Sequence, residues 1–405
     1  MGTLNLSAVP FRVGVATSPD DSMTGSRQPA SLNHTFANNV RFLSMVAIIG
    51  THTVGIYSGV VQLPSIPPSL VFIEQSLKFG TIAFFLVAGF LFGERIDAYG
   101  PLEYLKRRLR NVFVPWLFWF SLFCMLMLGA DVVHARLVVS VIPQVFIRCR
   151  DCLLGSAFWF VPNLLFALAL LLLFRRLLHD VRMGFAFLLA SLFYGVNIYG
   201  HWIPVPHTQA FFGFVFYLWL GAWCAWNFPA LEKRLARIPA SAMLGLIFLT
   251  LTLALAESKL LYALGSIDPL NTLRISNQLY SVVVVLGILK VKRALWPRFV
   301  DVRKHTFGLY LTHTAGIALL GAAFRRLLPY FAPLSRWRGS TEGLLLILVM
   351  FCLGYAGCLL AVRALLSNPR LRWAVGLPAQ RETRIEHTEE LKLGEACDAG
   401  QPQIS

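Results

Sequence analysis

Two ionisable residues, Arg41 and His52, stand eleven positions apart in the first strongly apolar segment of the chain. Eleven helical steps bring the second side chain to within about 20° of the first, after a rise of about 16 Å. An arginine at the edge of a bilayer and a histidine near its middle would then share one helix face. Ionisable side chains at that depth are costly and usually functional, and a neutral imidazole suits general-base chemistry. Taken alone, His52 also fits a structural histidine that hydrogen-bonds between helices.

A second histidine and a basic cluster extend this pattern. His313 lies roughly 12 Å into a later apolar segment, a depth comparable to that of His52, and two histidines at matched depth indicate a shared cavity. The basic run before another apolar segment contains Arg107 and Arg110, which are candidates to clamp phosphates through charge-assisted bonds. The same run also fits the ordinary positive flank of a membrane helix.

Membrane-spanning helices must hold these residues in place. Of the 405 residues, 57% are hydrophobic and only 14% are charged, whereas soluble domains carry roughly 25% charged residues. The apolar blocks are continuous, which favours helices over alternating barrel strands. We predict an all-α membrane bundle of about ten transmembrane helices, at 42–60, 79–93, 112–130, 157–174, 183–200, 210–226, 241–256, 277–289, 305–323 and 342–362. The second and eighth should extend toward Leu70 and Leu270, and Gly89 and Gly93 form a GxxxG motif that permits close helix packing.

The rest of the chain divides into tails and loops. Residues 1–37 and 376–405 are polar and are predicted to be disordered cytoplasmic tails, which leaves 38–375 as one membrane domain. One set of alternate loops holds 17 Lys and Arg in 55 residues, and the opposite set holds 10 in 91. The positive-inside rule therefore places both termini in the cytoplasm, although the arginine-rich loop 324–341 falls outside. The basic set comprises 94–111, 175–182, 227–240 and 290–304.

Composition also excludes several classes of function. The formal net charge is +16, but the basic residues lie between apolar blocks, where they orient a membrane protein, so we expect no nucleic-acid partner. Cys149 and Cys152 form a lone CxxC pair without the second pair that a structural zinc site needs, and we expect no metal. A redox role for this pair and incidental loop cysteines both stay open.

Taken in order, the motifs resemble those of the acyltransferase 3 family of membrane acyltransferases, over most of residues 38–375. The segment from Arg41 to His52 is similar to the family's Arg-x10-His signature, and Arg107 with Arg110 fits its Arg-x-x-Arg pair. Residues 84–92 resemble its Phe-Phe-x-x-Ser-Gly-Phe segment, with alanine in place of serine. Trp159-Phe160 and the stretch from Tyr310 to His313 resemble its Trp-Phe and Tyr-Leu-x-His segments.

The resemblance implies a multi-pass enzyme of the bacterial inner membrane. Its donor would be acetyl-CoA or another acyl-CoA from the cytoplasm, and its acceptor a hydroxyl of a glycan or lipid-linked sugar. Residues Trp159, Phe160 and Tyr310 would then bind substrate. One departure matters, because many members that modify polysaccharides carry Glu-x-Pro after the last helix, whereas this chain has Ser367-Asn368-Pro369.

Because a thioester is already activated, the residue that transfer needs is a base for the acceptor hydroxyl. We expect His52 to be that base, with His313 orienting it or relaying its proton. We expect Arg41, Arg107 and Arg110 to hold acyl-CoA. An acyl-histidine intermediate, transfer to an amine, and a secondary transporter with intramembrane histidines are the alternatives that the sequence leaves open.

Overall fold

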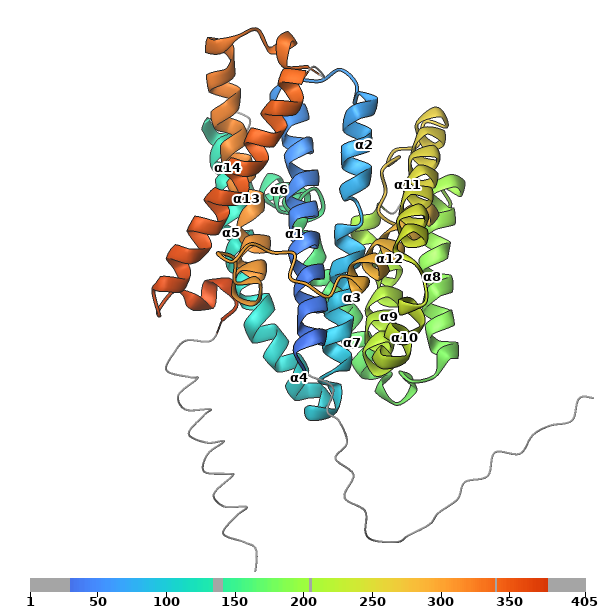
Figure 1. Ribbon diagram of the computed structural model, residues 1–405. Helices are drawn as coiled ribbons and strands as arrows, with labels where there is room; N and C mark the ends of the chain where they lie inside the picture. The colour runs from blue at the N-terminus through green and yellow to red at the C-terminus, as the bar shows by residue number, and fades with distance from the viewer. Residues whose placement is uncertain (1–29, 134–140, 204–205, 339–340, 378–405) are drawn as a thin grey trace, which may run out of the picture.

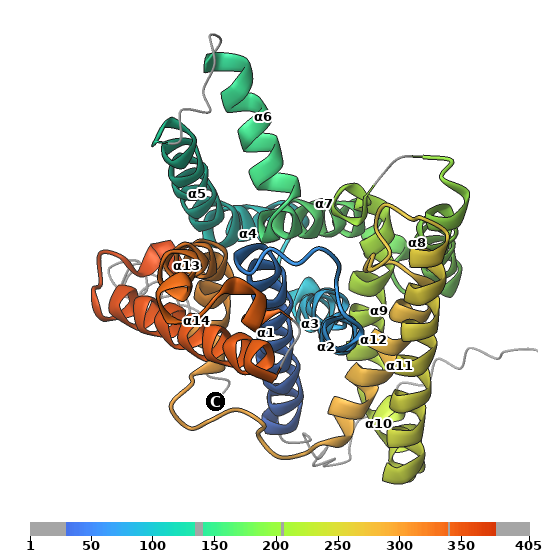
Figure 2. The same cartoon turned by 90° about the horizontal axis from the view of Figure 1, so that it is seen from above.

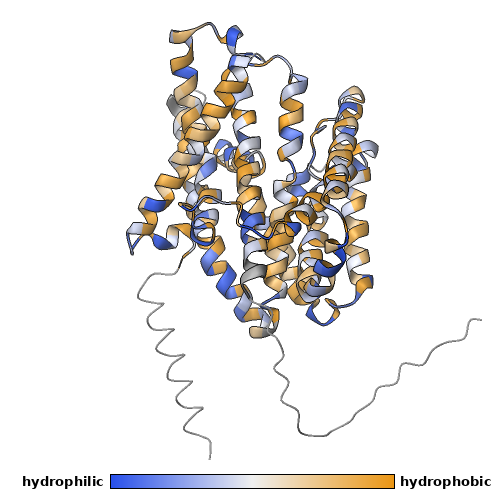
Figure 3. Cartoon of the chain, in the orientation of Figure 1, coloured by the Kyte–Doolittle hydropathy of each residue, from blue (hydrophilic) through white to orange (hydrophobic). Residues whose placement is uncertain are grey.

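The computed structural model describes residues 30–133, 141–203, 206–338 and 341–377, and every regular element within these ranges is helical, as predicted. The helices run side by side in one bundle (Figure 1). Hydrophobic residues cover most of their length, and hydrophilic residues are frequent at helix ends and in connecting loops (Figure 3). This is the distribution expected of a protein that crosses a bilayer.

Seven helical stretches in the described residues are long and apolar enough to cross a membrane. They are α1 (Ala30–Val60), α2 (Pro68–Leu77) with α3 (Gly80–Gly93), α4 (Pro101–Arg108) with α5 (Val114–Val133), α8 (Val181–Gly200), α11 (Ala240–Ala263), α13 (Val302–Phe331) and α14 (Thr341–Ser367). Two further pairs are sharply bent: α6 (Val141–Leu154) with α7 (Phe160–Leu173), by 76°, and α9 (Val215–Trp226) with α10 (Phe228–Ala236), by 87°. If each bent pair is counted as one span, the described residues contain up to nine membrane spans.

The predicted segments all fall on helices, but the described spans number seven to nine instead of ten. The difference lies at α12 (Ile275–Lys290), whose 16 residues rise about 24 Å, short of a bilayer core of about 30 Å. The second predicted helix extends past Leu70 as expected, whereas α12 does not extend to Leu270. Residues 30–37, assigned above to a tail, form the first turns of α1. The remaining tail residues, 1–29 and 378–405, lie outside the described residues.

Seen from above, α1 and α3 lie in the middle of the bundle, with α13 and α14 on one side and the α8–α12 group on the other (Figure 2). α5 and α6 project away from the rest, and Cys149 and Cys152 lie on α6 with free thiols. The central helices are thus placed to carry residues toward both halves of the bundle.

The GxxxG motif of α3 packs tightly against α9, as its small residues predict. A Cβ atom on Gly89 would lie 1.9 Å from the backbone oxygen of Leu218, and one on Gly93 would lie 2.8 Å from the Cα of Ala222. A side chain at either position would force the two helices apart. This contact fixes α3, which supplies residues to both cavities described below.

A coil at residues 264–274 leads into α12 and enters the helix bundle. Arg274 is fully buried and donates to the backbone oxygens of Ala254, at 2.9 Å, and Asn271, at 3.1 Å. It also donates to the side-chain oxygen of Gln75 on α2. Gln75 and Ala254 both lie inside membrane-length helices, so this coil reaches membrane depth. Irregular backbone is tolerated there only when it is enclosed by protein or lines a cavity, which makes it a pointer to a binding site.

Candidate active site

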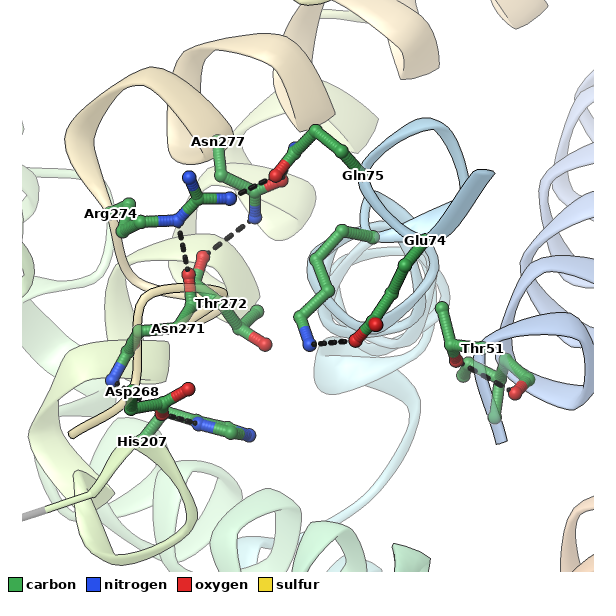
Figure 4. A network of polar contacts seen from close by, with 11 residues as sticks. Thr51, Glu74, Gln75, His207, Asp268, Asn271, Thr272, Arg274 and Asn277 are labelled. Carbon is green, nitrogen blue, oxygen red and sulfur yellow. Dashed lines mark hydrogen bonds and ion pairs between the residues drawn. The ribbon is translucent and has the colours of Figure 1, made fainter. Parts of the chain in front are cut away.

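A cavity of about 230 Å³ surrounds His52. Its polar lining comes from five elements, and the residues are Thr51, His52, Glu74, Lys78, Thr81, His207 and Thr272. Aromatic residues Trp159, Phe160 and Tyr310 complete the wall. Much of this lining comes from irregular backbone, including the 3-10 turns Ala157–Trp159 and His207–Gln209 and the coil at 264–274. Figure 4 shows His207 and Thr272 on one side, across from Glu74 and Thr51. We call this space the outer cavity.

The two predicted intramembrane histidines lie side by side, with ring centroids 5.2 Å apart, but only His52 lines the cavity. His52 is partly exposed to the cavity, whereas His313 behind it is completely buried. The Nδ1 of His313 lies 2.6 Å from the backbone oxygen of Tyr310, and because a carbonyl only accepts, Nδ1 carries the proton. The Nε2 of His313 therefore has a lone pair, with no hydrogen-bond partner in the described chain. Buried polar atoms without a partner are rare and are often found at functional sites.

Tyr310 and Phe160 form a partition between two cavities. Their rings lie 5.5 Å apart, and the Tyr310 hydroxyl donates to the backbone oxygen of Ala157 at 2.7 Å. Both side chains line the outer cavity and also a second cavity of about 300 Å³. The aromatic residues of the predicted motifs thus lie at the junction of the two spaces. Trp159 lies nearby on the outer side, with its ring 5.4 Å from that of His207.

The second cavity, which we call the inner cavity, is strongly basic. Arg41, Arg108 and Arg303 line it together with Tyr104 and a group of apolar residues, and no acidic residue is part of its described lining. Arg108 donates to the hydroxyl of Tyr104 at 2.8 Å. Within the described residues none of the three arginines forms an ion pair with a carboxylate. A cavity with this charge favours a polyanion.

Arg107 and Arg110, the arginines singled out from the sequence, lie elsewhere. The Nη2 of Arg107 is 3.1 Å from Glu103, and its guanidinium stacks over the Tyr99 ring at 4.5 Å. Arg110 is exposed, and neither residue lines the inner cavity. Arg107 and Arg108 are neighbours on α4, where successive side chains point about 100° apart, and Arg108 is the one that reaches the cavity.

Comparison with known proteins agrees with this geometry. A family model described as an acyltransferase domain, that of the acyltransferase 3 family, matches residues 34–363 and so covers His52, His313 and all three cavity arginines. The chain belongs to the acyltransferase 3 family. Neither the comparison with curated proteins nor that with solved structures found a match. With its membrane-length helices, the protein is therefore a multi-pass membrane acyltransferase.

The acyltransferase has one further polar pair at the outer cavity that the sequence did not reveal. The Nδ1 of His207 lies 2.8 Å from the Oδ2 of Asp268, and Asn271 donates to the same oxygen at 3.0 Å. These residues belong to two irregular loops 61 positions apart, so no helical spacing connects them. Only their proximity to Pro206 and Pro269, which break regular structure, marked the two loops as non-helical.

Proposed function

We propose that this acyltransferase moves an acetyl or other short acyl group from cytoplasmic acyl-CoA to a hydroxyl of a carbohydrate or glycolipid acceptor. The observation that carries the proposal is the pair of adjoining cavities with different charge. The inner one presents three arginines without carboxylate partners, and the outer one presents His52 and a balanced set of polar groups. Phe160 and Tyr310 separate them, so a donor and an acceptor entering from opposite sides would meet at this partition.

The inner cavity suits the donor because coenzyme A carries several phosphates. Guanidinium groups bind phosphate oxygens through paired, charge-assisted hydrogen bonds. Arg41 lies on the same face of α1 as His52, about 16 Å away along the helix, a length comparable to an extended pantetheine arm. The donor would thus be held by its phosphates at Arg41, Arg108 and Arg303, with its thioester near Tyr310.

We assign the proton transfer to His52. Its imidazole takes the proton of the acceptor hydroxyl as the oxygen attacks the thioester carbonyl. A carbon–oxygen bond forms, the carbon–sulfur bond breaks, and the imidazolium returns the proton to the departing thiolate, which leaves as CoASH. The free Nε2 lone pair of His313 is suited to accept a hydrogen bond from His52 and to orient it.

Release of CoASH tests this function directly. The purified protein, in lipid nanodiscs, is incubated with acetyl-CoA, and free thiol is followed with and without an acceptor fraction. Envelope glycans and glycolipids from cells with and without this gene are compared by mass spectrometry to identify the acylated product. Absence of both CoASH release and any acylated product would contradict the proposed function.

We also propose that the protein lies in a bacterial inner membrane with both termini in the cytoplasm, as the loop charges predict. Cys397 in the C-terminal tail serves as a native reporter. A membrane-impermeant maleimide should label Cys397 only after the cells are permeabilised, with Cys397→Ser as the control for labelling elsewhere. Labelling of Cys397 in intact cells would place this tail outside.

The structure offers a test of which arginines bind acyl-CoA. Lysine keeps the charge but lacks the planar fork of arginine. We expect the double Arg108→Lys, Arg303→Lys variant to bind acyl-CoA more weakly by about 1.5–3 kcal/mol, or roughly 10- to 150-fold, the range for hydrogen bonds to charged groups. The matched control is Arg107→Lys with Arg110→Lys. If the control pair weakens binding and the cavity pair does not, the assignment made from the sequence is the correct one.

A further inference from the structure

The His207–Asp268 pair has the geometry of an oriented hydrogen-bond acceptor. Burial raises the pKa of the Asp268 carboxyl, but the hydrogen bond from His207 and nearby positive charge outweigh it and hold that pKa below its ordinary value. Asp268 is therefore ionised near neutral pH and only accepts hydrogen bonds. It follows that Nδ1 of His207 donates, so that in the neutral form of the ring Nε2 keeps its lone pair. Such a nitrogen accepts a hydrogen bond from a hydroxyl group.

The pair also lies between the outer cavity and the protein surface. His207 lines the outer cavity, while Asp268 lines a separate hollow of about 190 Å³, formed by the end of α8, by His201, Ile203 and Pro206, and by the loop at 266–271. Both side chains are partly exposed, His207 by 19% and Asp268 by 33%. A molecule that passes from this hollow toward His52 would meet His207 on the way. The edge-to-face contact of Trp159 with His207 adds an aromatic surface at the same point.

The charges of the outer cavity differ from those of the inner one. Glu74 and Lys78 form an ion pair at 3.4 Å, and Asp268 is paired with His207, so each carboxylate at this end has a partner. Lys78, the ammonium group in the described lining of this cavity, is already paired with Glu74, so it is not free to balance an anionic ligand. The lining therefore favours a ligand that is polar but uncharged.

We propose that His207, oriented by Asp268, binds the acceptor substrate at the outer side of the active site by accepting a hydrogen bond from one of its hydroxyl groups. The reacting end of that acceptor is uncharged and polyhydroxylated. His207 is thus an acceptor-binding residue, Asp268 is its positioning residue, and His52 remains the base. This inference rests on the proposed function for the role of the bound molecule, although binding can be measured without turnover.

Binding of two simple glycosides tests this site. Methyl β-glucoside is the uncharged probe, and methyl β-glucuronide is its anionic counterpart. The full-length protein is held in lipid nanodiscs, so that no sugar-based detergent competes, and binding is measured by calorimetry or saturation-transfer NMR. We expect the glucoside to bind at least ten-fold more tightly than the glucuronide. We expect His207→Ala to weaken glucoside binding by ten-fold or more, and Asp268→Asn to weaken it less.

Two controls separate this role from a structural one. His207→Gln keeps a side chain that can donate to Asp268 and accept from a hydroxyl, so it should fold and restore part of the affinity if His207→Ala does not fold. His179→Ala removes a histidine that stacks on Trp226 away from both cavities, and should leave glycoside binding unchanged. Acyl-CoA affinity should be the same in the His207 variants and the wild type.

The proposal would be overturned if folded His207→Ala bound the glucoside as tightly as the wild type does. If His207→Ala does not fold, the same comparison is made with His207→Gln. Tighter binding of the glucuronide, or no glucoside binding by the wild type, would also overturn the proposal. CoASH release from acetyl-CoA, measured in parallel, tests the proposed function separately. If the wild type binds the glucoside at His207 but never releases CoASH, the proposed binding site stands and the proposed acyl transfer does not.

Discussion

His52→Ala should reduce acyl transfer by about 10²- to 10⁴-fold, the range for loss of a general base, while the protein still folds and binds acyl-CoA. The side chain is partly exposed to the outer cavity and makes no hydrogen bond in the described chain, so its removal costs little packing. The inner cavity with its arginines does not include His52. Initial rates of CoASH release and acyl-CoA affinity, measured on the same preparation, check both halves of this prediction.

The matched control for this variant is again His179→Ala, which removes an imidazole that contacts Trp226 and lines neither cavity, and should keep the wild-type rate. His52→Gln preserves the size of the side chain without its basicity, and it should be as inactive as the alanine variant. A His52→Ala protein that keeps most of the wild-type rate would show that another group takes the proton, and His207 would then be the first to examine.

Arg274→Ala should destabilise the fold by roughly 3 kcal/mol or more, because it leaves three oxygens without their donor at about 1–3 kcal/mol for each buried group. Arg274 is fully buried, and its removal leaves oxygens of Ala254, Asn271 and Gln75 without their donor. Each lost hydrogen bond to a charged group is worth roughly 1.5–3 kcal/mol. Thermal unfolding in detergent, followed by loss of the monodisperse peak, measures the effect.

Activity should fall together with stability in this variant, because the coil that Arg274 holds carries Thr272 and Asp268. Arg274→Lys should restore little, since one ammonium group cannot reach three oxygens that lie in different directions. The exposed Arg370→Ala is the control and should unfold at the wild-type temperature. An unchanged unfolding temperature in Arg274→Ala would show that the coil is held by other contacts.

Much of the fold was predictable because its signals are local. Long apolar blocks leave helices as the available structure in a bilayer, and a spacing of eleven residues puts Arg41 and His52 on one face. Matched depth anticipated that His52 and His313 would meet, and the structure brings their rings to 5.2 Å. These inferences need only helical geometry and membrane thickness.

The remaining features of the site depend on irregular backbone, which leaves no periodic pattern of residues in the sequence. Spacing also cannot show which side of a helix meets a cavity, and Arg108 lines the inner cavity while Arg107 and Arg110 do not. The sequence predicted that the eighth helix extends back toward Leu270, but a coil with a buried arginine stands there, and the helix begins at Ile275. His207 and Asp268 meet only through the path of two loops. Spacing within one element says nothing of such contacts.

The burial of Arg274 also constrains how the protein is made. Its partner Gln75 is synthesised 199 residues earlier. The hydrogen bond between them therefore cannot form until the ribosome has produced the start of α12. An arginine held at membrane depth is costly, and docking onto α2 and α11 supplies acceptors that offset this cost. Arg303 and His313 emerge later still. A nascent chain therefore has neither complete cavity, and the enzyme can become active only after nearly all of its helices have been inserted.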